Sequence, residues 1–256
     1  MATKSIYELP TSSRIKHFLV FERISQRIAT LKDQAPPWGL HAAVTALLEL
    51  ERITSKGNLR SELIKELHYQ ISSLEKLSQS SGVDRELLEN IVDQQRRLIG
   101  RLETGDKTFE QSLKENELLG QQRRRFGFHA NSHDYDSPAY QHMLARSINE
   151  QRAILDSWMQ AFATLSQAIE VVLGLIRSSA SPVSELAYQG YFQTRLDGEK
   201  KCQLLRIGLP ESSPYYPDVS LGRSKLSLRF LEPTDQYEHA LQIEEDIEFQ
   251  LTRCAL

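Results

Sequence analysis

The spacing of apolar residues changes near residues 178–182, and this change constrains the fold more than any other feature of the sequence. Before it, apolar side chains recur every three or four positions, which is typical of amphipathic helices. After it, apolar and polar side chains alternate, which is typical of strands with one buried face. A run of helices followed by a run of strands predicts an α+β fold in which the two parts are segregated.

The same change divides the chain into two expected domains, a helical domain over residues 1–180 and a small antiparallel β domain over residues 181–256. Prolines, glycines and capping residues separate about seven expected helices. The last three cover residues 107–124, 138–160 and 161–179. The final one has apolar residues on two faces and is expected to be the most buried.

The β domain contains several short segments of alternating pattern. Four of them are expected to form strands, namely 186–194, 202–209, 223–231 and 246–252. Residues 210–218 contain three prolines and are expected to form a loop. Near the N-terminus, residues 5–10 are a candidate strand, which would have to pair with a sheet of the β domain.

The overall charge argues against a general nucleic-acid binder. The formal net charge of the 256 residues is −3, whereas such proteins usually carry a clear basic excess. A site for an anionic partner must therefore come from a local basic patch, because the net charge of the whole protein does not produce a positive electrostatic potential.

Cysteine usage and the apolar segments predict a cytoplasmic protein. Cys202 and Cys254 fit no metal or disulfide pattern and are expected to be reduced thiols. The N-terminus lacks the apolar core of a signal peptide. The longest apolar stretch, 168–176, is interrupted by Glu170 and is too short to span a bilayer, so no membrane insertion is expected.

The motifs of common enzyme classes are absent from the sequence. It has no glycine-rich phosphate loop, no G-x-S-x-G, no H-E-x-x-H and no C-x-x-C. We therefore expect no catalytic residues and no cofactor, and a binding protein is favoured over an enzyme.

One cluster contains residue types that ligate metals. Its members are His129, His133, Asp134, Asp136 and His142. The H-x3-H spacing would suit a metal site on a helix, but the composition of this stretch is typical of a loop. Pro138 marks the start of a helix instead. No metal site is predicted, and the alternative of a metal-dependent enzyme would require these histidines to hold an ion.

The expected strand 223–231 carries the sharpest signal for a binding site. Because strand side chains alternate, Arg223, Lys225 and Arg229 face one side and the apolar residues face the other. The three cations extend over roughly 20 Å at the rise of a strand. They form either an anion-binding patch or a solvated face whose cations pair with Asp246 and Glu248 on a neighbouring strand.

A second basic site is expected at the turn that contains Lys56, Gly57 and Asn58. Asn58 is a candidate N-cap for the next helix, and Lys56 and Arg60 flank this helix start. Helix N-termini attract anions, so the turn is either an anion site or a solvated cap.

Arginines in the helical half leave a further alternative open. The run Arg123-Arg124-Arg125 ends an expected helix, where cations complement the helix dipole. Together with Arg96, Arg97 and Arg101 it would form a basic surface. Such a surface favours the alternative of a nucleic-acid-associated protein.

Several segments resemble the ZapD family of cell division proteins. They include YELPTSSRIKHFLVFERI at 7–24, GNLRSELIKEL at 57–67, LSQAIEVVLGLIRSSA at 165–180, YQGYFQ at 188–193, LLRIGLP at 204–210 and YPDVSLGRSKLSLRF at 216–230. The resemblance extends in order over nearly the whole chain, from residue 7 to the EFQL at 248–251.

The resemblance implies a role in bacterial cell division. Members of the family are cytoplasmic and act at the mid-cell division site. They bind the C-terminal tail of FtsZ, the tubulin-like GTPase of the division ring, form homodimers and bundle FtsZ filaments. They combine a helical with a β-strand domain and have no known cofactor or catalytic activity.

The resemblance also implies which residues bind the FtsZ tail. The family's binding is attributed to basic residues around a pocket, and the matches fall on Lys56, Lys225 and Arg229. Arg60 and Arg223 are adjacent candidates. The family tends to have arginine where this chain has Lys56 and Lys225, and lysine keeps the charge but lacks the bidentate fork.

Overall fold

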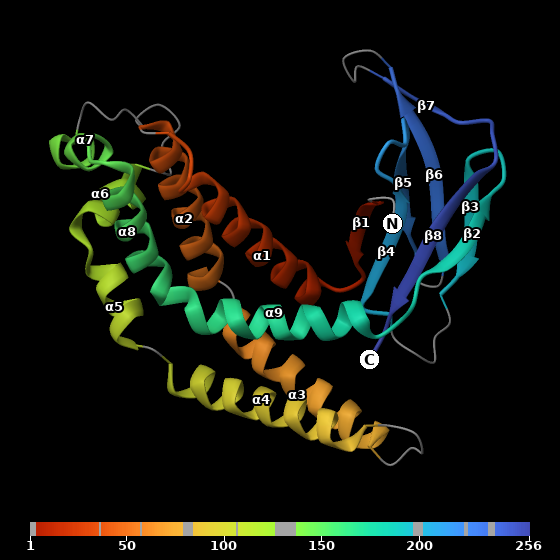
Figure 1. Cartoon of the computed structure of the whole chain (residues 1–256), viewed down its shortest axis with the longest axis horizontal. Coiled ribbons are helices and arrows are strands. Elements are labelled where there is room, and N and C mark those ends of the chain that lie inside the picture. Colours follow the sequence, from red (N-terminus) through yellow and green to blue (C-terminus); the bar gives the residue numbers. More distant parts are fainter. Residues whose placement is uncertain are drawn as a thin grey trace. The chain divides into compact units, whose positions relative to one another are not determined.

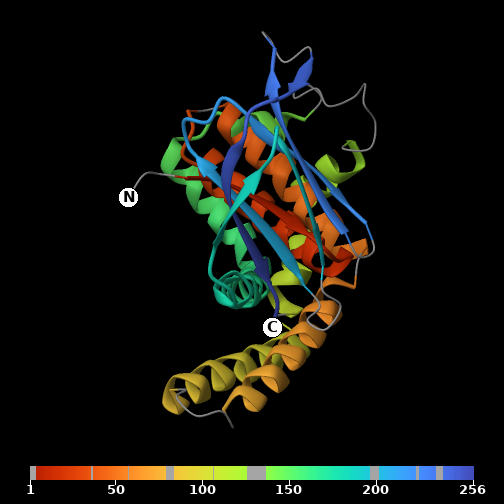
Figure 2. The same ribbon diagram turned by 90° about the vertical axis from the view of Figure 1, so that its right-hand side faces the viewer.

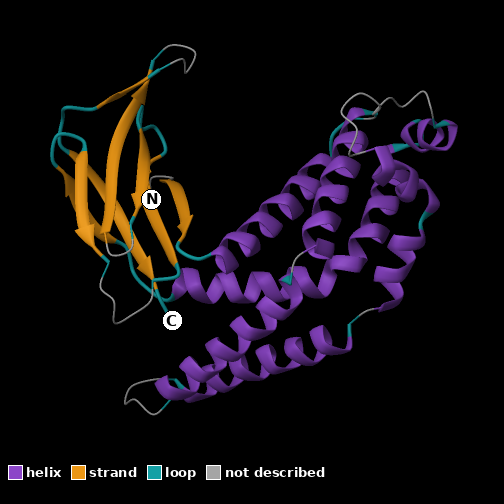
Figure 3. Cartoon of the chain, turned by 180° about the vertical axis from the view of Figure 1, so that it is seen from behind, coloured by secondary structure: helices purple, strands orange, loops and turns teal. Residues whose placement is uncertain are grey.

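The chain forms two compact units, a helical unit of residues His17–Val172 and a strand-rich unit of Met1–Lys16 with Leu173–Leu256. Figure 3 distinguishes the helices from the strands by colour. The computed structural model describes residues 4–35, 37–56, 58–78, 84–105, 107–125, 137–196, 202–222, 225–234 and 239–256.

The helices follow one another through the first two thirds of the chain (Figure 1). Their bounds are Ser13–Leu31 (α1), Trp38–Lys56 (α2), Leu59–Leu77 (α3), Arg85–Thr104 (α4), Lys107–Glu115 (α5), Glu117–Arg125 (α6), Pro138–Leu144 (α7), Ile148–Met159 (α8), the 3-10 turn Gln160–Phe162 (η2) and Ala163–Ser178 (α9). The expected order of helices before strands is confirmed.

Two of the expected helices are each divided in two. The segment 107–124 breaks at Asn116, whose side-chain oxygen accepts a hydrogen bond from a backbone N–H of α6 at 2.9 Å. The segment 138–160 breaks before Ser147, which forms a reciprocal capping box with Glu150. The prediction of single helices is wrong here because each polar side chain caps a new helix start.

Helices α3 and α4 form an antiparallel hairpin (Figure 1, Figure 2), and a polar contact is buried between them. Gln95 donates its side-chain N–H to Gln70 at 2.7 Å, and Gln70 donates to the carbonyl of Val172 at 3.2 Å. Both glutamines are fully buried. A buried amide that lacks a hydrogen-bond partner is costly. This pair of glutamines therefore connects α3 to both α4 and α9.

Helix α9 has the apolar face expected of a core helix. Leu165, Ile169 and Val172 are buried along it, whereas Val171 is half-buried. The continuous helical segment Ile148–Ser178 is long and apolar enough to cross a membrane by length and composition, and 44% of its most apolar window is buried within the protein. This segment is longer than the run 168–176, on which the expectation of no membrane insertion rests.

The strands form two sheets. Sheet A has the order β1-β4-β8-β2, and sheet B has the order β3-β6-β5 with β7 also on β6. Their bounds are Lys4–Pro10 (β1), Val183–Ala187 (β2), Tyr191–Arg195 (β3), Leu204–Pro210 (β4), Tyr216–Leu221 (β5), Lys225–Pro233 (β6), Ala240–Gln242 (β7) and Ile247–Cys254 (β8). All these pairings are antiparallel, and β1 confirms the candidate N-terminal strand.

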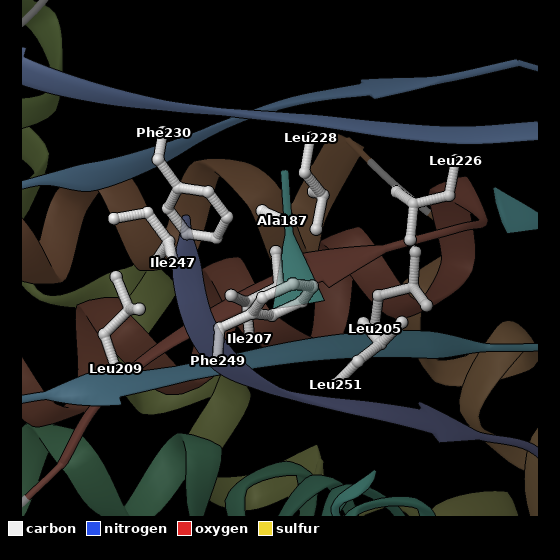
Figure 4. Close-up of a cluster of buried hydrophobic side chains, with 10 residues drawn as sticks. All are labelled: Ala187, Leu205, Ile207, Leu209, Leu226, Leu228, Phe230, Ile247, Phe249 and Leu251. Carbon is white, nitrogen blue, oxygen red and sulfur yellow. The ribbon is translucent and has the colours of Figure 1, made fainter. Parts of the chain in front are cut away.

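The two sheets pack face to face around one apolar core (Figure 4). From β6, Leu226, Leu228 and Phe230 point toward side chains of β4 and β8 such as Ile207 and Phe249. Phe230 and Phe249 lie with ring centroids 5.2 Å apart. Burial of these side chains fixes which face of each strand is inside and therefore which residues face outward.

The expected strand 186–194 is two strands in different sheets. Gln189 and Gly190 have φ angles of 49° and 68°, so the chain turns sharply between β2 and β3. A Cβ on Gly190 would lie 2.3 Å from the carbonyl oxygen of Ile243, which leaves room only for glycine. The prediction is wrong because alternation alone does not reveal a turn that changes sheets.

The expected loop 210–218 also needs correction. Its first residue, Pro210, ends β4, and its last three residues belong to β5, in which Pro217 is buried opposite Phe230. β5 is an edge strand, and proline is tolerated there because its missing N–H is not needed for pairing. The short strand β7 had no clear sequence signal.

Candidate partner-binding surface

The outer face of β6 carries the cations that the strand pattern predicted. Leu226 and Leu228 are fully buried, whereas Lys225 and Arg229 are exposed on the opposite face. Arg223 lies outside the residues that the structure describes. The alternation predicted for this strand is thus present in the structure, because one face of β6 packs on the core and the other faces outward.

Residues of β3 and β5 extend this surface on both sides of β6. Across from β3, Arg195 is opposite Lys225, Gln193 opposite Ser227 and Tyr191 opposite Arg229. Across from β5, Asp218 is opposite Arg229 and Ser220 opposite Ser227. We call this surface the basic sheet face; its members are Tyr191, Gln193, Arg195, Asp218, Ser220, Lys225, Ser227 and Arg229.

Arg229 is held by a carboxylate of the neighbouring strand. Its guanidinium donates to Asp218 at 2.8 Å, and the two side chains are 57% and 44% exposed. The sequence instead suggested Asp246 and Glu248 as partners for these cations. That suggestion is wrong because both precede or belong to β8, which lies in sheet A and does not pair with β6.

Arg195 was missed in the sequence but belongs to the same surface. It is exposed and lies directly opposite Lys225 in the β3–β6 register. Neither of them makes an ion pair with another residue of the described ranges. The sequence placed Arg195 just beyond an expected strand, so its register against Lys225 was not visible.

The second predicted site lies in the helical unit. Lys56 ends α2, and its side chain is outside the described part of the chain. Arg60, in the first turn of α3, forms an ion pair with Glu110 of α5. Gly105 has a φ angle of 65°, and a Cβ there would lie 2.6 Å from the Arg60 guanidinium. Arg60 therefore links the start of α3 to the junction of α4 and α5.

A cavity of about 230 Å³ opens beside Arg60. Leu59, Leu113 and Phe162 contribute apolar surface, and Glu51 and Lys114 contribute charge. Glu51 is already paired with Arg123 at 2.7 Å, and Glu110 with Arg60, so both carboxylates that line this cavity already have a cationic partner. Asn58 precedes α3, but its side chain makes no capping hydrogen bond.

Three of the six arginines that suggested nucleic-acid binding make polar contacts within the protein, and the side chain of Arg125 lies outside the described residues. Arg123 donates to Glu51 and to backbone carbonyls at the end of α5. Arg96 pairs with Glu75 at 2.8 Å, and Arg101 donates to Gln167 at 2.6 Å. Arg97 and Arg124 are exposed, and no ion pair with a described residue involves them. This distribution disfavours a single basic face made from all these arginines.

The outer face of sheet A has a different arrangement of charge. Glu8 of β1 accepts hydrogen bonds from Arg177 of α9 at 2.8 and 2.9 Å and from Arg206 of β4 at 3.0 Å. Burial alone would raise the pKa of Glu8, but the hydrogen bonds and charges of Arg177 and Arg206 outweigh it and lower the pKa below its ordinary value. We call this group the Glu8 cluster.

No catalytic or metal chemistry is apparent in the described ranges. Burial raises the pKa of Cys202, and raises that of Cys254 to about 11, so both thiols are protonated and weakly nucleophilic at neutral pH. No group of three or more His, Cys, Asp or Glu side chains gathers in the part of the chain that the structure describes. Of the histidine cluster only His142 falls inside it; His129, His133, Asp134 and Asp136 lie outside.

Comparison with known proteins identifies the family. A family model described as ZapD, cell division protein, matches residues 19–229. The chain belongs to the ZapD family. The cell division protein ZapD of Chromobacterium violaceum is 30% identical over 248 residues, which cover 97% of this chain and 98% of its own.

Two further relatives match over their whole length. The cell division protein ZapD of Methylococcus capsulatus is 28% identical over 256 residues, and that of Coxiella burnetii is 29% identical over 258 residues. Both alignments cover all of both chains. Membership in the ZapD family gives this protein a role in cell division, and its relatives are named for that role and not for an enzymatic activity.

Proposed function

We propose that this protein binds the C-terminal tail of FtsZ in the cytoplasm and, as a homodimer, cross-links FtsZ filaments at the mid-cell division site. The observation that carries the proposal is the basic sheet face, which carries three cations, Arg195, Lys225 and Arg229, and one carboxylate, Asp218, which pairs with Arg229. No catalytic step, cofactor or metal takes part.

Charge complementarity supports an acidic peptide as the ligand. The whole protein has a net charge of −3, so the local excess on the basic sheet face is what distinguishes it. In the ZapD family, as the sequence resemblance implies, the FtsZ tail is short, flexible and partly acidic. A flexible tail loses conformational freedom when it docks, so each contact is weak.

The proposed tail-binding residues are Lys56, Arg60, Arg223, Lys225 and Arg229. Lys225 has no described ion-pair partner and is available to a tail carboxylate without exchange. Arg229 and Arg60 already hold Asp218 and Glu110, so a tail carboxylate has to share or replace these partners. Lys225 is therefore expected to contribute most among the residues placed by the structure.

Cross-linking follows from multivalency. A dimer would present two tail-binding surfaces, and a filament presents a tail on each subunit. Weak single contacts then combine through effective concentration into firm attachment of neighbouring filaments. Because exposed ion pairs are screened beyond about 8 Å at physiological salt, bundling should weaken as salt rises.

Co-sedimentation with polymerised FtsZ of the same organism tests the proposal. The protein should pellet with intact filaments and not with filaments that lack the C-terminal tail. Lys225→Glu should reduce pelleting, whereas Arg97→Glu, an equal change of charge on α4, should not. Lys225→Glu is preferable to Arg229→Glu, because the latter would place a second carboxylate beside Asp218.

Two results would contradict the proposal. Pelleting that does not depend on the tail would remove the tail as the ligand. Failure to pellet with intact filaments at low salt, together with a mobility shift of duplex DNA at physiological salt, would favour the nucleic-acid alternative.

A further inference from the structure

We propose that the basic sheet face selects extended peptides whose two carboxylates are four residues apart, and that Asp218 acts as a built-in competitor for one of them. This inference rests on the proposed function, because it defines the peptide chemistry that the same surface accepts. It adds Arg195 as a binding residue. The end of the surface with Arg195 and Lys225 attracts a carboxylate of the peptide, whereas Asp218 at the other end competes with one.

The cations lie in two rows across the strands. One row contains Arg195 and Lys225, which are direct cross-strand neighbours. The other contains Arg229, flanked by Tyr191 and Asp218. Lys225 and Arg229 are four residues apart on β6, so the rows are separated by about 13 Å at the rise of a strand.

This spacing fits one pattern of carboxylates in an extended peptide. Side chains at positions i and i+4 of an extended chain point to the same side and are also about 13 Å apart. Side chains at i and i+3 point to opposite sides, so one of the two carboxylates would face away from the surface. The geometry therefore discriminates between peptides of identical composition.

The row of Arg195 and Lys225 is the stronger anion site. Like charges directly opposite each other in an antiparallel pair destabilise a sheet. Neither residue is neutralised by another described residue, and both are exposed. A carboxylate placed between them would relieve the repulsion and gain two charged partners, so Arg195 contributes to binding through the same contact as Lys225.

The row of Arg229 is occupied by an internal carboxylate. Asp218 accepts from Arg229 at 2.8 Å, yet both side chains are about half exposed, so an incoming carboxylate can reach the guanidinium. Asp218 competes with that carboxylate and repels it. Removing the charge of Asp218 should therefore strengthen binding, which is the reverse of what loss of a binding residue does.

Tyr191 gives this end an apolar neighbour. Its side chain is 41% exposed beside Arg229, and its backbone N–H donates to the carbonyl of Tyr188 at 2.9 Å. The preceding turn is fixed, since Gln189 donates to Asp246 at 2.9 Å and Phe230 donates to the carbonyl of Gly190 at 2.8 Å. The ring therefore stands on a rigid turn and can flank an apolar side chain of the peptide.

Fluorescence anisotropy of labelled peptides on the full-length protein tests the inference. One probe is the C-terminal tail of FtsZ from the same organism. Two designed probes of equal length and composition carry two glutamates at i and i+4 or at i and i+3 in a neutral background. The i+4 probe should bind about three-fold more tightly than the i+3 probe, because it forms one more exposed ion pair and such a pair contributes modestly.

Variants separate the two ends of the surface. Arg195→Ala should weaken binding of the FtsZ tail about three- to five-fold, as loss of one exposed charge pair predicts, and Asp218→Asn should strengthen it about two- to three-fold. Arg97→Ala and Glu211→Gln remove the same charges from exposed positions elsewhere and serve as matched controls. Circular dichroism and thermal unfolding of every variant confirm that the fold is retained.

The outcomes distinguish this inference from the proposed function. If the tail binds but Arg195→Ala and Asp218→Asn behave like their controls, the inference fails and the proposed function stands. If the tail does not bind while the i+4 probe is preferred over the i+3 probe, the proposed function fails and the peptide selectivity stands. If neither the tail nor the i+4 probe binds, both are overturned.

Discussion

The two outer faces of the β sandwich use cations in opposite ways. On sheet A, Arg177 and Arg206 enclose Glu8, whose side chain is only 13% exposed. On sheet B, Arg195 and Lys225 lie opposite each other without a described carboxylate between them. Arg177 and Arg206 are thus held by a carboxylate on one face, whereas Arg195 and Lys225 form an open charged surface on the other.

This contrast shows that charge alone does not identify a binding surface. A cation whose hydrogen bonds are satisfied by a half-buried carboxylate contributes to stability, and its charge is not available to a partner. A cation that faces another cation lowers stability slightly and gains from an anion supplied by a partner. The two faces should therefore respond oppositely to mutation.

The largest expected effect is on the Glu8 cluster. Glu8→Ala leaves Arg177 and Arg206 without their shared carboxylate, and should lower the free energy of unfolding by about 2–3 kcal/mol. Urea denaturation followed by circular dichroism measures this loss. Glu211→Ala, at an exposed position in the same unit, should change stability by less than about 0.5 kcal/mol. Equal effects of the two substitutions would contradict the claim that the cations around Glu8 stabilise the fold.

The pH dependence of stability sharpens the same point. Because the folded protein lowers the pKa of Glu8, the ionised form stabilises the fold, fully so above its ordinary pKa of 4.5. This contribution is lost as the pH falls from that value through the lower folded pKa. Glu8→Gln should therefore lose less stability than the wild type as the pH falls below 4.5, because it has no ionised form to lose. Parallel curves for the two proteins would show that Glu8 is not held ionised.

Arg60 provides a third case, within the helical unit. Its ion pair with Glu110 is less exposed than that of Arg229 with Asp218, and Gly105 lies against its guanidinium. Arg60→Ala should lower stability by up to about 1 kcal/mol, and Arg97→Ala, the matched change on α4, should be nearly neutral. Thermal unfolding of both variants measures the difference. If Arg60→Ala is also neutral, Arg60 is as available to a partner as Lys225.

The smallest expected effect has the opposite sign. Arg195→Gln removes the repulsion with Lys225 and should raise the free energy of unfolding by up to about 0.5 kcal/mol at low salt. The gain should vanish at high salt, because exposed charges are screened there. The same variant should bind the FtsZ tail more weakly. A loss of stability in Arg195→Gln would show that Arg195 has a stabilising partner within the protein. That result would contradict the description of sheet B as an open charged surface.

Much of the fold could be predicted from the sequence because burial imposes a period on it. The change of spacing near residue 180 separates helices from strands, and the alternation in β6 places Lys225 and Arg229 on the outer face. The prediction failed where one side chain or one backbone angle determines where an element begins or ends. Examples are Asn116, Ser147 and the left-handed Gly190. Such features have no periodic signal.

The candidate site was less predictable than the fold because it depends on register. The partner of Arg229 is Asp218, which lies in a segment whose prolines suggested a loop. Arg195 joins the surface only because the turn at Gln189 moves β3 into the sheet that contains β6. Neither relation follows from spacing within one strand, since pairing between strands is set by turns and by the packed core.

The most direct measurement maps where the FtsZ tail touches this protein. Amide chemical shifts of the isotopically labelled full chain would be followed as the tail peptide is added. Binding at the basic sheet face predicts that the shifts concentrate in residues 191–195 and 225–229, with the α2–α3 turn as the second region and the Glu8 cluster unchanged. Shifts that concentrate around Glu8 and Arg206 on sheet A, with none in β3 and β6, would contradict it.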